Sequence, residues 1–285
     1  MKLLHTVSEL RHWRHDGDTP VIIVPTMGAL HEGHLHLARE ARRLVGADGR
    51  VAVSIFVNPL QFGPGEDLDR YPRTLDSDVA GCREAGADMV FAPSDKEIYQ
   101  PDRSIQITEK SLSKVLCGAS RPGHFDGVCT VVAKLFNLFQ PAAAVFGKKD
   151  YQQLAIIRRM VRDLDIPIVL HGIETVREAD GLAMSSRNRY LTSEERAQAP
   201  ALRAALERAQ ASWREGVTGS ARLRAGIEQY LASHAPLGRV DYIGIVDAAT
   251  LEERTVLPSD QHHLIAIAVF FGGARLIDNI ELVPK

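Results

Sequence analysis

The sequence predicts an α/β protein with a doubly wound parallel sheet, followed by a smaller α+β domain. In the first half of the chain, short apolar runs rich in β-branched residues alternate with helical patterns, as in parallel sheets covered by helices. After about residue 190 the pattern changes to long helices and then apolar strands. With 285 residues, 45% of them hydrophobic, the chain is long enough for one large domain or two smaller ones. We expect domains at 1–181 and 182–285.

The elements of the first half follow one another as strands and helices in turn. Continuous apolar runs such as Val21-Ile22-Ile23-Val24 predict buried strands, and apolar residues at helical spacing predict the helices between them. In order these are strand 21–24, helix 35–45, strand 51–57, helix 75–85, strand 89–91, helix 130–139, strand 142–146, helix 152–164 and strand 168–170. Ligands of such sheets bind beyond the carboxyl ends of the strands. We therefore expect His31, Asn58, Gly147 and Val176, which each follow a strand, to converge.

The elements of the second half are two helices and two strands. Thr192 and the acidic residues after it predict an N-cap and a first turn, so a long helix is expected to run to about Arg214. A second helix is expected at 221–233, and apolar runs predict strands at 240–246 and 264–271.

The overall composition excludes several function classes. The 34 basic and 36 acidic residues give a net charge of −2, so no general nucleic-acid or membrane surface is expected. An anionic substrate must then meet local positive groups. Three cysteines fit neither a C-x-x-C nor a zinc pattern and suit a reducing cytoplasm. The N-terminus does not resemble a signal peptide, and the apolar runs are shorter than the ~20 residues that span a bilayer.

The stretch Pro25–His34 has the residues of a phosphate-binding turn. Gly28 and Gly33 allow the backbone to approach a ligand closely, and the helix that follows offers N–H groups to phosphate. His31 and His34 can donate hydrogen bonds as charge develops on phosphate oxygens. A metal site that includes His36 is the alternative, but in the zinc motif H-E-x-x-H the second histidine comes one residue later.

Two further stretches are candidates for binding small polar substrates. Asn58 and Gln61 follow a strand, and their amides can pair with both donors and acceptors. The charged segment 66–74 is then expected at the edge of the site or on the solvated surface. Arg121–Val128 is a Gly-rich loop that is either site lining or only a turn.

Two segments supply positive charge for phosphate. Gly147–Gln153 combines a glycine, two lysines and Asp150 after a strand, although its spacing is not that of a Walker A loop. Met184–Arg187 offers two hydroxyls, backbone amides and a guanidinium that can bind phosphate with two parallel hydrogen bonds. Its place between the two predicted domains suits a mobile loop that closes over a bound phosphate group.

Together these segments make the chain resemble the pantothenate synthetase family, also called pantoate–β-alanine ligases, within the HxGH nucleotidyltransferase superfamily. The likeness covers the whole chain in order, and it rests on 25–34, 56–63, 66–74, 121–128, 146–153, 180–188 and 275–279. It implies a Rossmann-like N-terminal domain of the nucleotidyltransferase type, a C-terminal α+β lid domain and a homodimer. It also implies condensation of (R)-pantoate with β-alanine through pantoyl adenylate, with ATP converted to AMP and pyrophosphate and with Mg²⁺ as the metal.

The resemblance also implies roles for individual residues. Catalysis is assigned to His34, His31, Lys149 and Arg187, and Asp78 is a candidate for the neighbourhood of Mg²⁺. The expected contacts of pantoate and β-alanine are Gln61, Gln153, Asn58 and Thr26. The expected ATP-binding residues are Met27, Gly28, His31, Gly33, His34, Gly147, Lys148, Lys149, Asp150, Val176, Met184, Ser185, Ser186 and Arg187.

The nucleophile of the implied reaction is the substrate carboxylate, so no nucleophilic side chain is required. Two alternatives stay open: adenylyl or cytidylyl transfer to another acceptor, and a nucleotide-sensing or RNA-binding relative without turnover. A dimer interface is expected at a strand near 128–132 or in the C-terminal domain.

Overall fold

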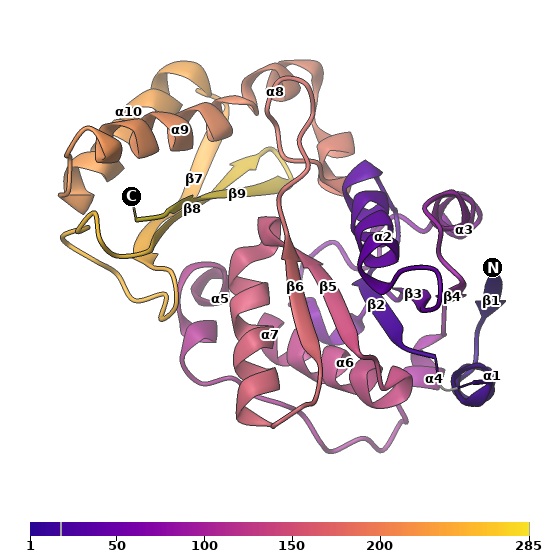
Figure 1. The fold of residues 1–285 in the computed structure, drawn as a ribbon. Coiled ribbons are helices and arrows are strands. Elements are labelled where there is room, and N and C mark those ends of the chain that lie inside the picture. Colours follow the sequence, from indigo (N-terminus) through magenta and orange to yellow (C-terminus); the bar gives the residue numbers. More distant parts are fainter. Residues whose placement is uncertain (18, 285) are drawn as a thin grey trace. The chain divides into compact units, whose positions relative to one another are not determined.

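The computed structural model describes residues 1–17 and 19–284, which form two compact units (Figure 1). The first unit comprises the described residues of 1–110, 121–148 and 153–174. The second comprises 111–120, 149–152 and the described residues from Thr175 onward. Neither unit is one continuous stretch of chain. The division into domains at residue 181 stays a prediction.

The first unit contains a parallel sheet. Among the described residues its strands run in the order β1-β4-β3-β2-β5-β6. Their bounds are β1 Lys2–Leu4, β2 Val21–Thr26, β3 Arg50–Ile55, β4 Met89–Phe91, β5 Ala143–Gly147 and β6 Val169–Ile173. Figure 1 shows β2 and β5 side by side, and Ile22 pairs with Ala143. The strand order reverses between β2 and β5, which is where open α/β sheets bind ligands.

Helices connect the parallel strands. They are α1 Val7–His15, α2 Glu32–Val45, α3 Leu75–Glu84, α4 Asp95–Ile98, α6 His124–Phe139 and α7 Tyr151–Asp163, with short 3-10 turns η1 Pro59–Gln61 and η3 Lys148–Asp150. Right-handed connections place α2 and α3 on one face of the sheet and α6 and α7 on the other, because the strands they join progress in opposite directions. Ala38 and Ala41 of α2 are buried against Val24 and Val53. Their small side chains allow α2, which follows β2, to pack closely on the sheet.

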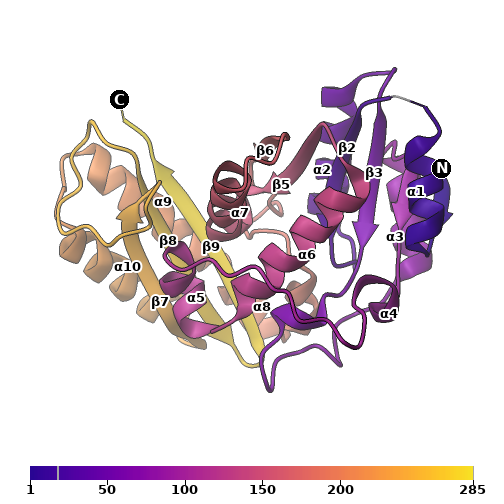
Figure 2. The same ribbon diagram turned by 90° about the horizontal axis from the view of Figure 1, so that it is seen from below.

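The second unit is built on an antiparallel sheet in the order β7-β8-β9. Its elements are β7 Gly238–Asp247, β8 His263–Phe271, β9 Ala274–Leu282, α5 Leu116–Ser120, α8 Ser193–Gln198, α9 Ala201–Arg214, α10 Ser220–His234, η2 Leu112–Lys114 and η4 Ser186–Tyr190. Figure 2 shows α9 and α10 lying together along this sheet. Leu206 and Ile227 of these helices share an apolar core with Ile245 and Ile267 of the strands.

The predicted fold class is confirmed, with differences at element ends. Helix α2 begins at Glu32 and α6 at His124, earlier than apolar spacing alone predicts, because the polar first turns belong to the helices. The strand predicted at 51–57 ends at Ile55, shortly before Pro59, which has no N–H to donate. Residues 128–132 lie within α6, so the strand proposed there as a dimer edge is wrong.

In the second unit the expected long helix is two helices. Helix α8 ends at Gln198 and α9 starts at Ala201, because Pro200 between them cannot continue the ladder of backbone hydrogen bonds. Strand β9 was not predicted, since Asp278 and Asn279 interrupt its apolar alternation. No helix among the described residues combines the length and apolarity needed to cross a membrane.

Candidate active site

The turn after β2 is held by a buried carboxylate. Gly28 and Ala29 both have positive φ, 81° and 51°, so their successive N–H groups converge on one side of the chain. Asp78 of α3 accepts the N–H of Ala29 at 2.9 Å and that of Leu30 at 2.8 Å. Its side chain also accepts the Thr74 hydroxyl at 3.0 Å, and the residue is 2% exposed. Asp78 thus fixes the entry of the chain into α2.

His31 and His34 form the N-cap of α2. The Nδ1 atom of His31 accepts the Gly33 N–H at 3.1 Å, and the Nδ1 atom of His34 accepts the His31 N–H at 3.4 Å. The two ring centroids lie 4.0 Å apart. Because both Nδ1 atoms act as acceptors, the neutral rings carry their protons on Nε2. Each ring can therefore offer an Nε2–H donor at the positive end of the helix dipole.

Gln61 is oriented by buried neighbours. The Asn58 amide donates to Gln61 Oε1 at 3.1 Å and to the Gly127 carbonyl at 3.0 Å, and it accepts the Tyr99 hydroxyl at 2.8 Å. Burial raises the pKa of Tyr99, so that hydroxyl stays a donor. Gln61 in turn donates to the sulfur of Met27 at 2.9 Å. The geometry gives Asn58 the role of holding Gln61.

Thr26, another expected substrate contact, is also engaged with the protein. Its hydroxyl donates to the Ser54 carbonyl at 2.7 Å and accepts the Gly28 N–H at 3.3 Å. Through these two hydrogen bonds, Thr26 stabilises the turn after β2. The contacts of Asn58 and Thr26 with substrate stay predictions.

The loop before α6 supports the backbone of Gln61. His124 Nδ1 bonds the Gln61 carbonyl at 2.8 Å, and Arg121 reaches the same oxygen at 3.2 Å. Arg121 also forms an ion pair with Glu66 at 2.5 Å. Burial by itself raises the pKa of Glu66, but the hydrogen bonds and charge of Arg121 outweigh it and lower that pKa.

Gly127 on α6 is essential to this packing. A Cβ at residue 127 would lie 2.4 Å from the carbonyl oxygen of Leu60 and 2.6 Å from the backbone nitrogen of Gln61. These separations are far below van der Waals contact, so only glycine lets α6 approach η1. The loop 121–128 therefore supports the predicted substrate residue Gln61.

The segment after β5 divides between the two units. Lys148, in the first unit, forms an ion pair with Glu174 at 2.5 Å. Lys149 belongs to the second unit, where its carbonyl accepts the Asn279 amide at 2.9 Å. Within the described chain its ammonium makes no ion pair or hydrogen bond, and the same is true of the amide of Gln153. Both groups are thus available to a ligand.

Tyr151 and Gln152 attach this segment to the second unit. The Gln152 amide donates to the carbonyls of Leu112 and Val115, each at 2.7 Å, and accepts the Cys117 N–H at 3.0 Å. The Tyr151 hydroxyl donates to the Ala248 carbonyl at 3.2 Å. The beginning of α7 therefore has fixed backbone positions in that unit.

Val176 and Met184 face each other across a tight hairpin. The Met184 N–H donates to the Val176 carbonyl at 3.0 Å, and Gly181 turns the chain with a φ of 90°. Ser185 then caps η4, its hydroxyl accepting the Arg187 N–H at 3.2 Å. The structure thus brings Val176 together with the segment 184–187, as expected for residues that share one ligand.

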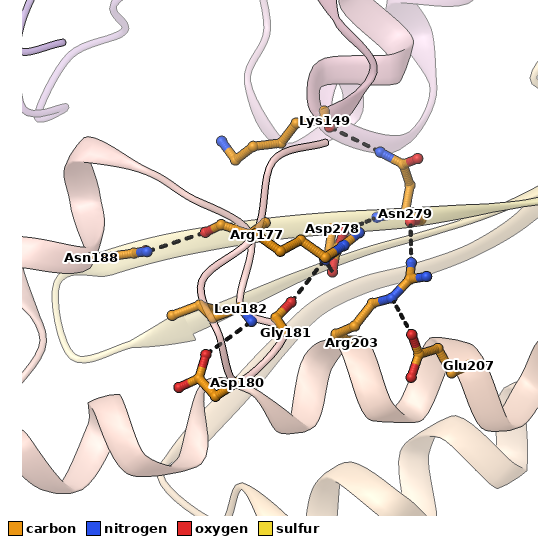
Figure 3. A network of polar contacts seen from close by, with 11 residues as sticks. Lys149, Arg177, Asp180, Gly181, Leu182, Asn188, Arg203, Glu207, Asp278 and Asn279 are labelled. Carbon is orange, nitrogen blue, oxygen red and sulfur yellow. Dashed lines mark hydrogen bonds and ion pairs between the residues drawn. The ribbon is translucent and has the colours of Figure 1, made fainter. Parts of the chain in front are cut away.

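An ion-pair network surrounds this hairpin, as Figure 3 shows. Arg177 binds Asp278 through two parallel bonds of 2.8 and 2.9 Å and donates to the Gly181 carbonyl at 3.0 Å. Asn188 donates to Glu178 at 2.8 Å.

The sequence did not predict the structural roles of four residues: Asp278, Asn279, Asp78 and Gly127. The only signal for the first two was that the segment 275–279 resembles the family.

The described residues offer little to a metal ion. They contain no cluster of three or more His, Cys, Asp or Glu side chains that could hold one. Both oxygens of Asp78 already accept hydrogen bonds from the protein. Its donor set therefore does not fit direct binding of Mg²⁺, and its place near that ion stays a prediction.

Comparison with known proteins identifies the family. The family model for pantoate-beta-alanine ligase matches residues 2–281. The pantothenate synthetase of Akkermansia muciniphila is 51% identical, over 99% of this chain and 100% of its own. The crystal structure of the pantothenate synthetase from Thermus thermophilus has a TM-score of 0.92 at 48% identity, with 100% of both chains covered.

A third relative was solved with ligands. The pantoate-beta-alanine ligase of Francisella tularensis, complexed with beta-gamma ATP and β-alanine, has a TM-score of 0.81 at 32% identity and covers 99% of this chain and 98% of its own. Matches of this extent show that the chain belongs to the pantoate–β-alanine ligase family.

Proposed function

We propose that this chain condenses (R)-pantoate with β-alanine at the expense of ATP, forming pantothenate, AMP and pyrophosphate. The observation that carries the proposal is the pair His31 and His34, whose Nε2–H donors stand at the amino end of α2 beside the sheet's switch point. Family membership and the Francisella complex with beta-gamma ATP and β-alanine support the same substrates.

The first step is attack of the pantoate carboxylate on the α-phosphorus of ATP, in line with the departing pyrophosphate. The P–O bond to the carboxylate forms as the bond to the β-phosphate oxygen breaks, so negative charge builds on phosphate oxygens. We assign the Nε2–H groups of His31 and His34 to this charge, and Lys149 and Arg187 to the triphosphate. The family's role of proton donor falls to His34, which here keeps its proton and donates the Nε2–H as a hydrogen bond to a phosphate oxygen that gains charge.

The remaining predicted ATP contacts line the nucleotide. We propose that Met27, Gly28 and Gly33 offer backbone to the phosphates and that the backbone of Val176 lies beside adenine. Ser185 and Ser186 add hydroxyls, and their turn presents N–H groups. The pairing of Val176 with Met184 supports one shared ligand for that hairpin. Gly147, Lys148, Lys149 and Asp150 complete the proposed contacts.

The second step is attack of the neutral β-alanine amine on the acyl carbon of the adenylate, which expels AMP. We propose that the amides of Gln61 and Gln153 orient pantoate and that Gln61 also contacts β-alanine. An amide suits this role because it pairs with hydroxyls and carboxylates without a charge of its own. The mixed anhydride hydrolyses readily, so the C-terminal unit is proposed to act as a lid that excludes water.

Magnesium is proposed to enter with ATP. Mg²⁺ keeps several waters and binds substrate phosphates readily, so it does not require an all-protein cage. When bound it neutralises charge on the triphosphate. The saturated hydrogen bonding of Asp78 favours a structural role for that carboxylate over a role as ligand.

The assembly and the compartment are proposed from the family resemblance and from the state of the cysteines. A homodimer is proposed from the family resemblance, and light scattering of the purified chain measures it. A cytoplasmic location is proposed because Cys82, Cys117 and Cys129 are buried free thiols, which suits a reducing compartment.

The test of the function is AMP release from ATP and pantoate, with and without β-alanine, at saturating Mg²⁺. Sustained AMP formation that requires both acids is the expected result. Sustained pyrophosphate without β-alanine indicates transfer to another acceptor. ATP binding without turnover in either case contradicts the proposal and favours a nucleotide sensor.

A further inference from the structure

We infer that Asn279, with Asp278 and Arg177, is a positioning residue that holds Lys149 and the segment 184–187 as one preassembled phosphate-binding group. The inference rests on the proposed function and deepens it, because it names what places two of the proposed ATP-binding segments. These residues are assigned no contact with ATP.

The first link is the hydrogen bond from Asn279 to Lys149. Asn279 Nδ2 donates to the Lys149 carbonyl at 2.9 Å, and the residue is only 9% exposed. Its backbone N–H donates to Asp278 Oδ1 at 2.8 Å. The Lys149 backbone is therefore bonded to β9, although the two residues lie 130 positions apart.

The second link runs from Asp278 to the hairpin. The Asp278 side chain is 3% exposed and meets the Arg177 guanidinium through two parallel bonds, which fix the plane of both groups. Arg177 also donates to the Gly181 carbonyl, and its backbone forms a bridge with Ala183. Met184 comes next in the chain.

The hydrogen bond from Asn279 restrains the backbone of Lys149 and does not engage its charged ammonium group. Figure 3 shows the ammonium of Lys149 pointing away from Asn279, while the carbonyl points toward it. A hydrogen bond to the carbonyl fixes the peptide plane after Lys149 and so limits the directions its side chain can take. The side-chain bonds of Gln152 hold the same segment three residues further on. Lys149 and the hairpin thus share one rigid frame inside the second unit.

Preassembly of this kind is expected to change the rate of the chemical step more than the affinity for ATP. A cation held in place stabilises developing charge at no further ordering cost, and a displacement of ~1 Å can lower a rate ~100-fold. Replacement of Asn279 is therefore expected to act through Lys149. Its effect should disappear once the lysine side chain is gone.

The experiment is a double-mutant cycle on pyrophosphate release in a single turnover with ATP and pantoate. Asn279→Ala is expected to slow release ~10-fold or more in the intact protein and less than ~2-fold in a Lys149→Ala background. Equal losses in both backgrounds overturn the inference. An inactive unsubstituted protein would instead contradict the proposed function, so the two failures are distinguishable.

The matched control is Gln210→Ala. Gln210 Nε2 also donates to a carbonyl of β9, that of Glu281, at the same 2.9 Å. Both variants should lower the unfolding temperature similarly, whereas only Asn279→Ala should slow pyrophosphate release. An equal slowing by Gln210→Ala would show a general structural effect and overturn the inference. If Asn279→Ala fails to fold, Asn279→Ser, whose hydroxyl is too short to reach the Lys149 carbonyl, takes its place in the cycle with the same expected outcomes.

Discussion

The two regions of this chain that are proposed to bind phosphate hold their backbones by different means. In the first unit, His31 and His34 cap their own helix through contacts within three residues, and the Asp78 carboxylate closes the turn from the neighbouring α3. In the second unit, Lys149 and the hairpin at Val176 are held by an ion pair and an amide from β9, more than 100 positions away.

The two regions should therefore respond differently to substitutions. A local cap depends on a few residues that fold together, so a substitution there should change chemistry with little effect elsewhere. The long-range network requires that β9 be in place, so its integrity depends on the fold of the whole second unit. Four predictions test this contrast, from the largest expected effect to the smallest.

The largest effect is expected at the local cap itself. His34→Ala removes one donor to developing phosphate charge and should lower the rate of pyrophosphate release by ~10²–10³-fold, as loss of an oxyanion-hole donor does. Lys149→Ala is expected to cost as much. Single-turnover quench kinetics measure both, and Cys117→Ala serves as the control with a nearly intact rate. A near-normal rate for His34→Ala would refute the role given to that ring.

Gly127→Ala tests the packing beneath Gln61. The added methyl would meet the Leu60 carbonyl, so η1 must shift and the variant should lose ~1–3 kcal/mol of unfolding free energy. The KM for pantoate should rise, because Gln61 moves with η1. In contrast, Gly226→Ala on α10 meets nothing within 4 Å and should gain ~0.5–1 kcal/mol. Urea unfolding and steady-state kinetics separate the two, and equal stability of both variants would contradict the packing argument.

The same contrast explains what could be predicted from the sequence. Strands such as Val21–Val24 and the His31–Gly33–His34 spacing are local patterns, so the parallel sheet was predicted from them and is confirmed. The expected ATP residues fall into segments that the structure places at strand and helix ends. Their roles stay predictions.

The residues that hold the proposed ligand-binding residues in place could not be predicted from the sequence. Asp278 and Asn279 look like loop residues, because they break the apolar alternation of β9; their partners, Arg177 and Lys149, are far away in sequence. Asn58 was expected to bind substrate because an amide after a strand suits a ligand. Its amide also donates to Gln61 and Gly127, and only the fold shows those partners, while the contact with substrate stays a prediction.

Asp78→Asn weakens the turn of the first unit without touching the histidines. An asparagine keeps one acceptor oxygen but turns its NH₂ toward the other backbone N–H, which is then left unsatisfied. A buried unsatisfied donor costs ~1–3 kcal/mol, so urea unfolding should show a loss of that order. The rate of pyrophosphate release should fall by less than for His34→Ala. A larger rate loss without loss of stability would favour a direct role of Asp78 near Mg²⁺ over a structural one.

The smallest effect is expected from the ion pair between Arg121 and Glu66. Arg121 also donates a hydrogen bond to the Gln61 carbonyl. Arg121 keeps the pKa of Glu66 below its ordinary value, so this carboxylate stabilises the folded state above the pKa that it has when unfolded. That contribution disappears as the pH falls through the lower pKa of the folded state. Urea unfolding from pH 7 down to about pH 3 should therefore show a shallower loss of stability for Glu66→Gln than for the unsubstituted protein, since the usual pKa of glutamate is ~4.3. Arg121→Gln should remove the same pH dependence, because the pair acts as one unit. An unchanged profile in either variant would mean that the ion pair contributes nothing measurable, as for many solvent-exposed pairs.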